Sequence, residues 1–192
     1  EFEDVAWPDE RSKTIIAAGR LAPVKRFEDL VRAWAVLAKD FPDWNVKIFG
    51  SGPEEGRLRG LIETLDLRAS VFLMGHARDM KSAYLDAEIL AHPAAHEGFG
   101  LSVAEGLSCG LPVVAYADCD GVNEFVRTGY NGLMVDREGG AEAYAAALRQ
   151  LIEKPALRRE LRANTRGSVA HFTSAAFLDA WTSILKDLEA SK

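Results

Sequence analysis

The sequence predicts an α/β fold in which helices wind on both faces of a six-stranded parallel sheet. Three observations predict this doubly wound fold. Short apolar runs alternate six times with segments whose apolar residues recur at helical spacing. The apolar runs are continuous rather than alternating, as expected when both faces of a sheet are covered. Residues that could bind a ligand or act in catalysis follow four of the runs. They would lie at the carboxyl ends of strands, where parallel sheets bind their ligands.

Three pairs of strand and helix are predicted before residue 87. The apolar run over residues 14–19 ends in glycine and indicates a buried strand, after which Phe27, Leu30, Val31 and Trp34 recur at helical spacing. Similar patterns predict strands over 45–50 and 71–75 and helices over 54–65 and 79–86.

The alternation continues to residue 135 and is then replaced by helices. A strand is predicted over 89–93, and residues 97–105 are expected to open a helix that Gly110 and Pro112 end. The remaining predicted elements are strands over 112–116 and 132–135, a short helix near Val122, and helices over 141–153, 155–170 and 175–188.

The chain divides into three predicted parts. Residues 1–12 begin without Met, are acidic and lack a pattern, which is typical of a tail at the boundary of a domain cut from a longer protein. Residues 13–170 contain every predicted strand and form one ligand-binding domain. Residues 171–192 form a C-terminal helix with Phe177 and Trp181 on one face.

Composition limits the functions open to this chain. Its 192 residues are 48% hydrophobic, and a net charge of −6 without a basic tract argues against nucleic acid as a partner. No run approaches about 20 apolar residues, so we expect no transmembrane segment. Cys109 and Cys119 lack metal-ligand spacing and favour a reducing, cytoplasmic compartment. The histidines form no cluster by spacing, so no metal site is predicted.

The most informative stretch is residues 97–105, where Glu97 and Glu105 stand eight positions apart around a glycine-flanked turn. The start of a helix leaves backbone N–H groups without partners and carries partial positive charge, which suits a phosphate. Carboxylates beside a phosphate are favourable only if the ligand also offers hydroxyls. The stretch therefore indicates a nucleotide, a sugar phosphate or both. Two ordinary helical acids are the simpler alternative.

Two cations follow the first predicted strand. Arg20 offers a rigid fork for phosphate oxygens and Lys25 a mobile point charge, so together they could stabilise a diphosphate leaving group. Alone, this short motif would more often be two ordinary surface cations. Glu105, inside the helix, suits a ribose diol, and Glu97, in the loop before it, suits a hydroxyl of a transferred sugar.

Other enzyme classes fit the motifs less well. A pair of acidic residues also occurs in glycosidases, but a hydrolase does not need an anion-binding helix start between them. Residues 50–53 resemble a dinucleotide fingerprint, yet they follow the second strand and lack the acid expected after the next one. We therefore interpret Gly50 and Gly52 as a tight turn lining the pocket. His76 follows the third strand, where a base or phosphate could pass, and His92 is interpreted as a packing residue.

Several motifs carry a resemblance to a known family when they are taken in order: Gly19-Arg20-Leu21 with Lys25, then residues 50–53, 71–75, 97–105, 109–114 and 129–135. Together they resemble the C-terminal, donor-binding domain of the family 4 retaining glycosyltransferases, a Rossmann-like half of the GT-B fold. The match covers essentially residues 13–155, and the Glu-x7-Glu element is the hallmark of that family.

This resemblance implies a role for each matching position. Arg20, Lys25 and Glu97 would be catalytic, with the cations on the diphosphate of a nucleotide-sugar donor and Glu97 facing the sugar. Glu105 would bind the ribose hydroxyls. Further donor contacts, in part from backbone amides, are implied for Gly19, Gly50, Gly52, Met74, His76, Gly98, Phe99, Gly100 and Leu101. The sugar would pass to an acceptor hydroxyl with retained anomeric configuration, without a metal or other cofactor.

Enzymes of this family have two similar domains, and nothing in this sequence supplies the second. The resemblance therefore implies an absent N-terminal acceptor-binding domain, through which a cytoplasmic enzyme could touch the inner face of a membrane. We expect this chain alone to bind nucleotide weakly and to catalyse little or nothing. Residues 93–96 depart from the Pro-Ser common in the family, and the loop around Asn123 is unusual, which puts loop contacts in question.

Two other functions stay open at this stage. The chain could be a nucleotide-sugar-binding module without a catalytic partner, or a GT-B-fold epimerase or phosphorylase. A second doubly wound half upstream would favour the transferase. Arg20, Lys25 and the two acids together favour transfer, and a phosphorylase would need a cofactor lysine that we cannot identify.

Overall fold

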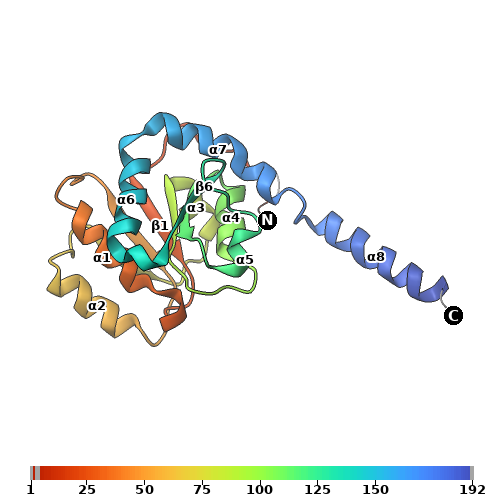
Figure 1. The fold of residues 1–192 in the computed structure, drawn as a ribbon, viewed down its shortest axis with the longest axis horizontal. Coiled ribbons are helices and arrows are strands. Elements are labelled where there is room, and N and C mark those ends of the chain that lie inside the picture. Colours follow the sequence, from red (N-terminus) through yellow and green to blue (C-terminus); the bar gives the residue numbers. More distant parts are fainter. Residues whose placement is uncertain (1, 3–4, 191–192) are drawn as a thin grey trace.

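The computed structural model describes residue 2 and residues 5–190, and within them a six-stranded parallel sheet lies between helices (Figure 1). The strands are β1 (Thr14–Ala18), β2 (Asn45–Phe49), β3 (Val71–Gly75), β4 (Ile89–His92), β5 (Val113–Tyr116) and β6 (Gly132–Val135). The helices are α1 (Phe27–Leu37), α2 (Glu55–Thr64), α3 (Met80–Asp86), α4 (Leu101–Ser108), α5 (Asp120–Asn123), α6 (Gly140–Glu153), α7 (Pro155–Val169) and α8 (Ser174–Ala190).

The predicted doubly wound fold is confirmed, and so is each predicted strand and helix, with ends that differ by a few residues. The helix α4 begins at Leu101, after the predicted glycine-flanked turn, and Gly100 takes a left-handed conformation (φ 79°) just before it. Two short 3-10 helices, η1 (Pro23–Lys25) and η2 (Arg137–Gly139), were not predicted. Both are too short to leave a periodic pattern in the sequence.

The strand order β3-β2-β1-β4-β5-β6 decides where a ligand can bind. β1 and β4 are neighbours at the centre of the sheet, and the chain winds outward from them in opposite directions. The loops that follow these two strands therefore diverge and leave a crevice at the carboxyl edge of the sheet. The polar residues that follow the first four strands are all directed to this edge.

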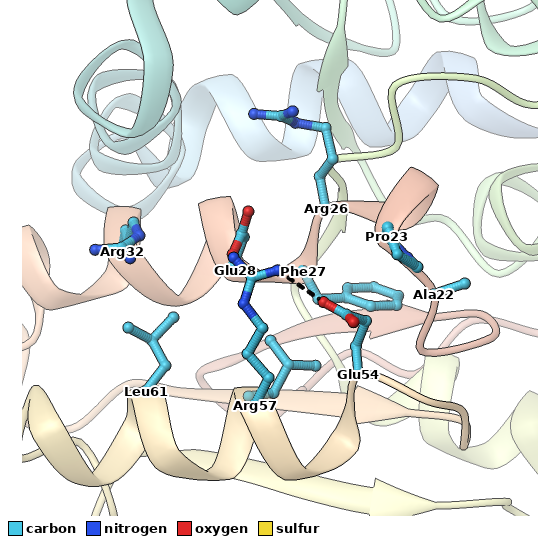
Figure 2. A pocket seen from close by; sticks show the side chains of 10 residues that line it. Ala22, Pro23, Arg26, Phe27, Glu28, Arg32, Glu54, Arg57 and Leu61 are labelled. Atoms are coloured by element: carbon cyan, nitrogen blue, oxygen red, sulfur yellow. Dashed lines mark hydrogen bonds and ion pairs between the residues drawn. The ribbon is translucent and has the colours of Figure 1, made fainter.

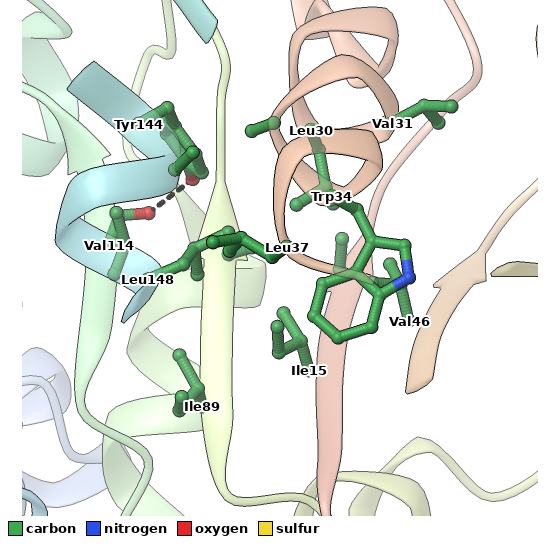
Figure 3. Packing of buried hydrophobic residues seen from close by; sticks show 14 of the residues in the cluster. Ile15, Leu30, Val31, Trp34, Leu37, Val46, Ile89, Val114, Tyr144 and Leu148 are labelled. Carbon is green, nitrogen blue, oxygen red and sulfur yellow. Dashed lines mark hydrogen bonds between the residues drawn. The ribbon is translucent and has the colours of Figure 1, made fainter. Parts of the chain in front are cut away.

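Each face of the sheet is covered by its own apolar core. On one face, α1, α2 and α6 bury a cluster that includes Ile15, Trp34 and Leu148 (Figure 3). Tyr144 is fully buried there, and its hydroxyl donates a 2.6 Å hydrogen bond to the backbone oxygen of Val114. This bond offsets the desolvation of the hydroxyl. On the other face, a second cluster is formed mainly with α3 and α4.

Residues 5–12 contact the domain, which differs from the tail expected of them. The indole N–H of Trp7 donates to the backbone oxygen of Ser108 at 2.9 Å, and the guanidinium of Arg166 lies 4.6 Å from the Trp7 ring centroid. Arg11 donates to the backbone oxygen of Cys109 at 2.7 Å. These partners are about a hundred residues or more away in the chain, so no local pattern in the sequence could reveal them.

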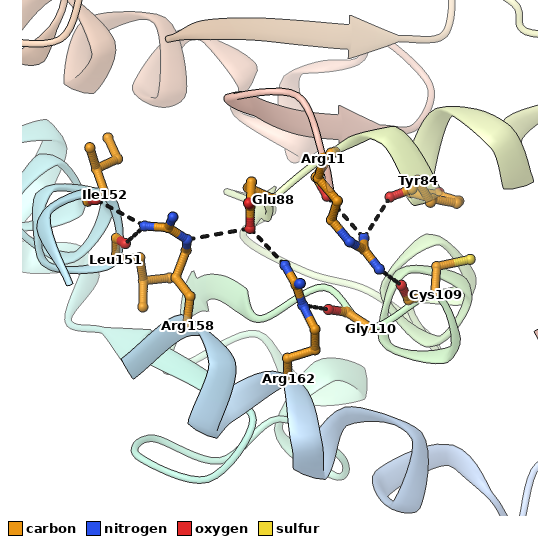
Figure 4. Close-up of polar contacts among 10 residues, drawn as sticks. Arg11, Tyr84, Glu88, Cys109, Gly110, Leu151, Ile152, Arg158 and Arg162 are labelled. Carbon is orange, nitrogen blue, oxygen red and sulfur yellow. Dashed lines mark hydrogen bonds and ion pairs between the residues drawn. The ribbon is translucent and has the colours of Figure 1, made fainter. Parts of the chain in front are cut away.

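A cluster of charges joins α7 to the start of β4 (Figure 4). The Glu88 carboxylate accepts a 2.6 Å hydrogen bond from Nη2 of Arg162, and Nε of Arg158 lies 3.4 Å from the same oxygen. Arg158 also donates to the backbone oxygen of Ile152 at 2.9 Å. All three charged side chains are less than a fifth exposed, so one carboxylate serves two largely buried cations.

Replacing Glu88 by Gln should lower the free energy of unfolding by about 2 kcal/mol, because both guanidinium groups would lose their shared negative charge. Urea unfolding of the two proteins measures the difference. Glu63→Gln is the matched control, since Glu63 pairs with Arg68 on the exposed surface and its loss should leave stability nearly unchanged. Equal destabilisation by the two replacements would contradict a special role for the buried cluster.

The helix α8 runs away from the rest of the domain (Figure 1). Its large apolar side chains are half exposed or more: Phe177, Leu178, Trp181, Ile184, Leu185 and Leu188. The rings of Phe177 and Trp181 share one face, as predicted, with centroids 6.2 Å apart. Among the residues that the structure describes, no helix is both long enough and apolar enough to span a bilayer.

Candidate functional site

A pocket of about 680 Å³ lies at the carboxyl edge of the sheet, beside the junction of β1 and β4. We call it the edge pocket. Its volume falls in the range of sites for small molecules. Residues from the ends of β1, β2 and β3 and from α3 and α4 line it. They are Ala18, Gly19, Arg20, Phe49, Gly50, Ser51, Gly52, His76, Ala77, Met80, Tyr84, Leu101, Ser102 and Glu105.

Glycines let the loops after β1 and β2 meet backbone to backbone. A Cβ atom on Gly50 would lie 1.9 Å from the oxygen of Gly19, and one on Gly52 would lie 2.3 Å from the oxygen of Leu21. The N–H of Gly19 donates to the oxygen of Phe49 at 3.0 Å, which holds the two loops together. The predicted tight turn thus forms a wall of the edge pocket, as expected from the sequence.

His76 lies in the edge pocket, where the sequence analysis expected it. Its Nε2 atom is 2.7 Å from the hydroxyl oxygen of Ser51, so the loops after β2 and β3 are joined inside the pocket. Met74 is not brought to the same place. Its side chain is 45% exposed and lines a separate hollow together with Arg59 and Val71.

The start of α4 faces the edge pocket with its backbone. Leu101 lines the pocket, and no side chain caps the helix at Gly100. The N–H of Val103 donates to the oxygen of Gly100, which leaves the N–H groups of Leu101 and Ser102 available to an anion. The ring of Phe99 packs on Phe125 and Phe172, with centroids 5.6 and 4.9 Å away, so that a contact of Phe99 with a ligand would come from its backbone. Gly98 lies against Gly121, because a Cβ on Gly121 would be 2.7 Å from the oxygen of Gly98, whereas a Cβ on Gly98 would have no atom within 4 Å.

Lys25 and Glu97 contact each other beside the edge pocket. The 3-10 helix η1 turns Lys25 back over Gly19, and the N–H of Ala95 donates to the oxygen of Val24 at 2.9 Å, which brings the two loops together. Nζ of Lys25 forms an ion pair with Oε1 of Glu97, and the two side chains are only 17% and 16% exposed. Burial lowers the pKa of Lys25.

The other predicted cation, Arg20, is exposed and lines the edge pocket. Within the described part of the chain, its guanidinium forms neither an ion pair nor a hydrogen bond. A mobile guanidinium at the rim of a pocket can fork onto two phosphate oxygens.

Tyr84 is a site residue that the sequence analysis missed. Its side chain is buried, lines the edge pocket and donates a 3.3 Å hydrogen bond to Oε2 of Glu105. Burial and the nearby Glu105 carboxylate raise the pKa of Tyr84, so the hydroxyl keeps its proton. A single tyrosine among the apolar residues of a short helix is typical of a core residue, and nothing in its spacing indicates a site.

His92 lies deeper, at the end of β4. Its side chain is 3% exposed, and its Nε2 atom is 3.5 Å from Oε1 of Glu97 and forms no hydrogen bond with any residue that the structure describes. Burial, and to a lesser extent the charge of Lys25, lower the pKa of His92 to about 3, so the imidazole is neutral near pH 7. In the sequence His92 is indistinguishable from a packing residue, and its place opposite Glu97 was not predicted.

A second hollow of about 410 Å³ lies between α1 and α2 and contains several charges (Figure 2). Arg57 forms ion pairs there with Glu28 and with Glu54, so the opposite charges are largely paired with each other. None of the predicted site residues lines this hollow. Among the described residues, no group of three or more His, Cys, Asp or Glu side chains is placed to hold a metal ion.

Comparisons with known proteins identify the family and the fold of this chain. A sequence model of the family described as glycosyl transferases group 1 matches residues 2–168. An uncharacterized glycosyltransferase of Haemophilus influenzae is 34% identical over 174 residues, which are 91% of this chain and 49% of that protein. The pneumococcal O-GlcNAc transferase GtfA, crystallised with UDP and GlcNAc, is 28% identical and superposes with a TM-score of 0.86 over 93% of this chain and 37% of GtfA.

A further solved structure, TarM of S. aureus, shares the fold with a TM-score of 0.85 at 22% identity, over 93% of this chain and 37% of TarM. The chain therefore spans about half, or less, of the length of these relatives. The family match covers nearly the whole α/β unit, including every residue that lines the edge pocket. The chain belongs to the glycosyl transferases group 1, and its six-stranded unit is a glycosyltransferase domain of the GT-B fold.

Proposed function

We propose that this chain is the donor-binding domain of a retaining glycosyltransferase that moves a sugar from a uridine diphosphate sugar to an acceptor hydroxyl. One observation carries the proposal: Arg20, the uncapped start of α4 and the carboxylate of Glu105 line the edge pocket, and Lys25 lies beside it against Gly19. A helix start that can bind an anion, beside a carboxylate that can accept hydrogen bonds from hydroxyls, suits a ligand in which a diphosphate is joined to sugars.

The positively charged groups would act on the diphosphate. Arg20 and Lys25 bind its oxygens and stabilise the negative charge that develops there as the bond to the sugar breaks. The N–H groups at the start of α4 donate to the same oxygens. We assign the stabilisation of the leaving group to these groups rather than to a metal ion.

The two carboxylates would act on hydroxyls at opposite ends of the diphosphate. Glu105 lines the edge pocket and binds the ribose diol, with its Oε2 atom held by Tyr84. Glu97 lies outside the edge pocket, beside η1, and faces the sugar. The sugar is transferred to the acceptor with retention of its anomeric configuration. His76 and Ser51 lie on the far wall, where the base would pass.

The choice of uracil as the base rests on relatives. GtfA, at 28% identity, was crystallised with UDP and GlcNAc. Its pneumococcal sequence, named as a UDP-N-acetylglucosamine–peptide N-acetylglucosaminyltransferase subunit, aligns with 91% of this chain. Because this chain shares the fold of GtfA at 28% identity, we expect it to prefer UDP.

A separate N-terminal domain would carry the acceptor, and α8 would contact it. The exposed apolar face of α8, with Phe177 and Trp181, is the surface that we assign to this contact. The complete enzyme would act in the cytoplasm in glycan, lipid-linked or polysaccharide biosynthesis, with peripheral membrane contact through its acceptor half. Sustained sugar transfer by this chain alone would contradict the assignment of the acceptor site to another domain.

Replacing Glu105 by Ala should weaken UDP binding about tenfold, because a carboxylate on a ribose diol makes charge-assisted hydrogen bonds. Calorimetric titration with UDP, GDP and ADP measures this change and should rank UDP first. The affinity ratio of UDP to 2′,3′-dideoxyuridine diphosphate should fall towards one in the variant. Glu63→Ala, on the exposed face of α2, is the control. Unchanged UDP affinity in Glu105→Ala would exclude the ribose contact, and equal binding of the three nucleotides would exclude uracil recognition.

A further inference from the structure

Lys25 is shared between two partners in the proposed function. In the structure its ammonium group forms an ion pair with Oε1 of Glu97, and both side chains are largely buried. The proposed function requires the same ammonium to bind a diphosphate. The ammonium has three N–H donors, but a diphosphate that binds it competes with Glu97 for the same positive charge, so its binding weakens the contact of Lys25 with Glu97.

A carboxylate that loses its cation in a largely buried place needs another donor. His92 is placed to be that donor. Its Nε2 atom faces Oε1 of Glu97, the same oxygen that Lys25 contacts, from 3.5 Å. It is also one of two buried side-chain polar atoms that have no hydrogen-bond partner in the described part of the chain. A buried polar atom without a partner needs an explanation, and a small shift of Glu97 would supply the missing bond.

We propose that His92 is a positioning residue. When Lys25 binds the diphosphate of the donor, His92 replaces Lys25 as the group that donates a hydrogen bond to the Glu97 carboxylate. Nε2–H of the neutral imidazole donates to Oε1 of Glu97 and keeps the carboxylate directed at the sugar. The inference rests on the proposed function, because it assumes that Lys25 binds the diphosphate. It adds that Glu97 competes with the diphosphate for Lys25, and that His92 weakens this competition.

The low pKa of His92 is consistent with this role. A histidine whose pKa is about 3 stays neutral at pH 7 and adds no charge beside Lys25. A cationic imidazole would repel Lys25 and would itself neutralise Glu97. A neutral donor can orient the carboxylate without removing the charge that faces the sugar.

The test is a double-mutant cycle that measures UDP affinity by calorimetry in the whole chain. Glu97→Met removes the charge and the acceptor while keeping the length of the side chain. It should strengthen UDP binding about three- to tenfold, because Lys25 loses its competing partner. His92→Phe should weaken UDP binding about three- to tenfold, because the carboxylate then has no donor to replace Lys25. In the Glu97→Met background, His92→Phe should have no further effect.

The matched variant is His92→Gln, whose side-chain amide can donate from nearly the position of Nε2. It should recover most of the UDP affinity that His92→Phe loses, and thermal unfolding of each variant shows that the fold is retained. The inference would be overturned if His92→Phe weakened UDP binding equally in the parent chain and in the Glu97→Met background. It would also be overturned if His92→Phe left UDP affinity unchanged. If His92→Phe does not fold, Glu97→Met still decides, since unchanged or weaker UDP binding in that variant removes the competition on which the inference depends.

The failure of the proposed function gives a different result. Lys25→Met should weaken UDP binding at least about tenfold if Lys25 binds the diphosphate. An unchanged affinity in Lys25→Met would contradict the proposed function itself. A loss in Lys25→Met, together with a His92→Phe effect that does not depend on Glu97, would contradict only the role of His92.

Discussion

Replacing Arg20 by Ala and Lys25 by Met in one protein should weaken UDP binding by about a hundredfold or more. Each cation is expected to form charge-assisted hydrogen bonds with the diphosphate, and each such bond contributes about 1.5 to 3 kcal/mol. Lys25 is largely buried, which strengthens its interaction with an anion, whereas Arg20 is exposed and contributes less. Calorimetric titration with UDP at low and moderate salt measures the loss.

Controls separate a site effect from a change in net charge. Arg68→Ala removes an exposed cation outside the edge pocket and should leave UDP affinity unchanged. Arg20→Lys keeps the charge but loses the fork, so we expect an intermediate affinity. A double variant that binds UDP as well as the parent chain would contradict the assignment of the diphosphate to these two cations.

Replacing Gly50 by Ala should lower the free energy of unfolding by about 3 kcal/mol or more. The new Cβ would lie 1.9 Å from the backbone oxygen of Gly19, so the loops after β1 and β2 would have to separate. Gly50 also has a φ of 131°, which side chains strongly disfavour. Urea unfolding followed by circular dichroism measures the change. Because both loops form a wall of the edge pocket, UDP affinity should fall as well.

Gly60→Ala is the matched control for this prediction. Gly60 lies in α2, is exposed, and has no atom within 4 Å of the place where its Cβ would be. Alanine in an exposed helix should stabilise the protein by about 0.5 to 1 kcal/mol. If Gly50→Ala were equally harmless, the close approach of the two loops would not be a requirement of this fold.

The elements of the fold were predictable because their signals are local. The continuous apolar run of β1 and the helical spacing of Phe27, Leu30 and Trp34 can each be recognised in a short window. The alternation of such windows then indicates a doubly wound sheet. The 3-10 helix η1, which turns Lys25 towards Glu97, was not predicted because three residues carry no period.

The site was predictable only in part. Arg20 and His76 follow strands, Glu105 lies within α4, and the structure brings all three to the edge pocket as the topology suggests. Met74 was expected beside them, yet it lies within β3, at the outer edge of the sheet, and lines another hollow together with Val71, Phe72 and Leu73. Tyr84 and His92 look like ordinary core residues in the sequence, since only their partners give them a role.

The sequence by itself determined the order of the strands and helices, the glycine-rich turns and the types of side chain available for a diphosphate and for hydroxyls. Only the tertiary structure decided which of these side chains meet. Lys25 contacts Glu97 across 72 positions of the chain, Tyr84 reaches Glu105 across 21, and Trp7 reaches Ser108 across 101. Such contacts depend on how strands pair and loops approach in space, whereas the periodicity that predicts an element extends over only a few residues.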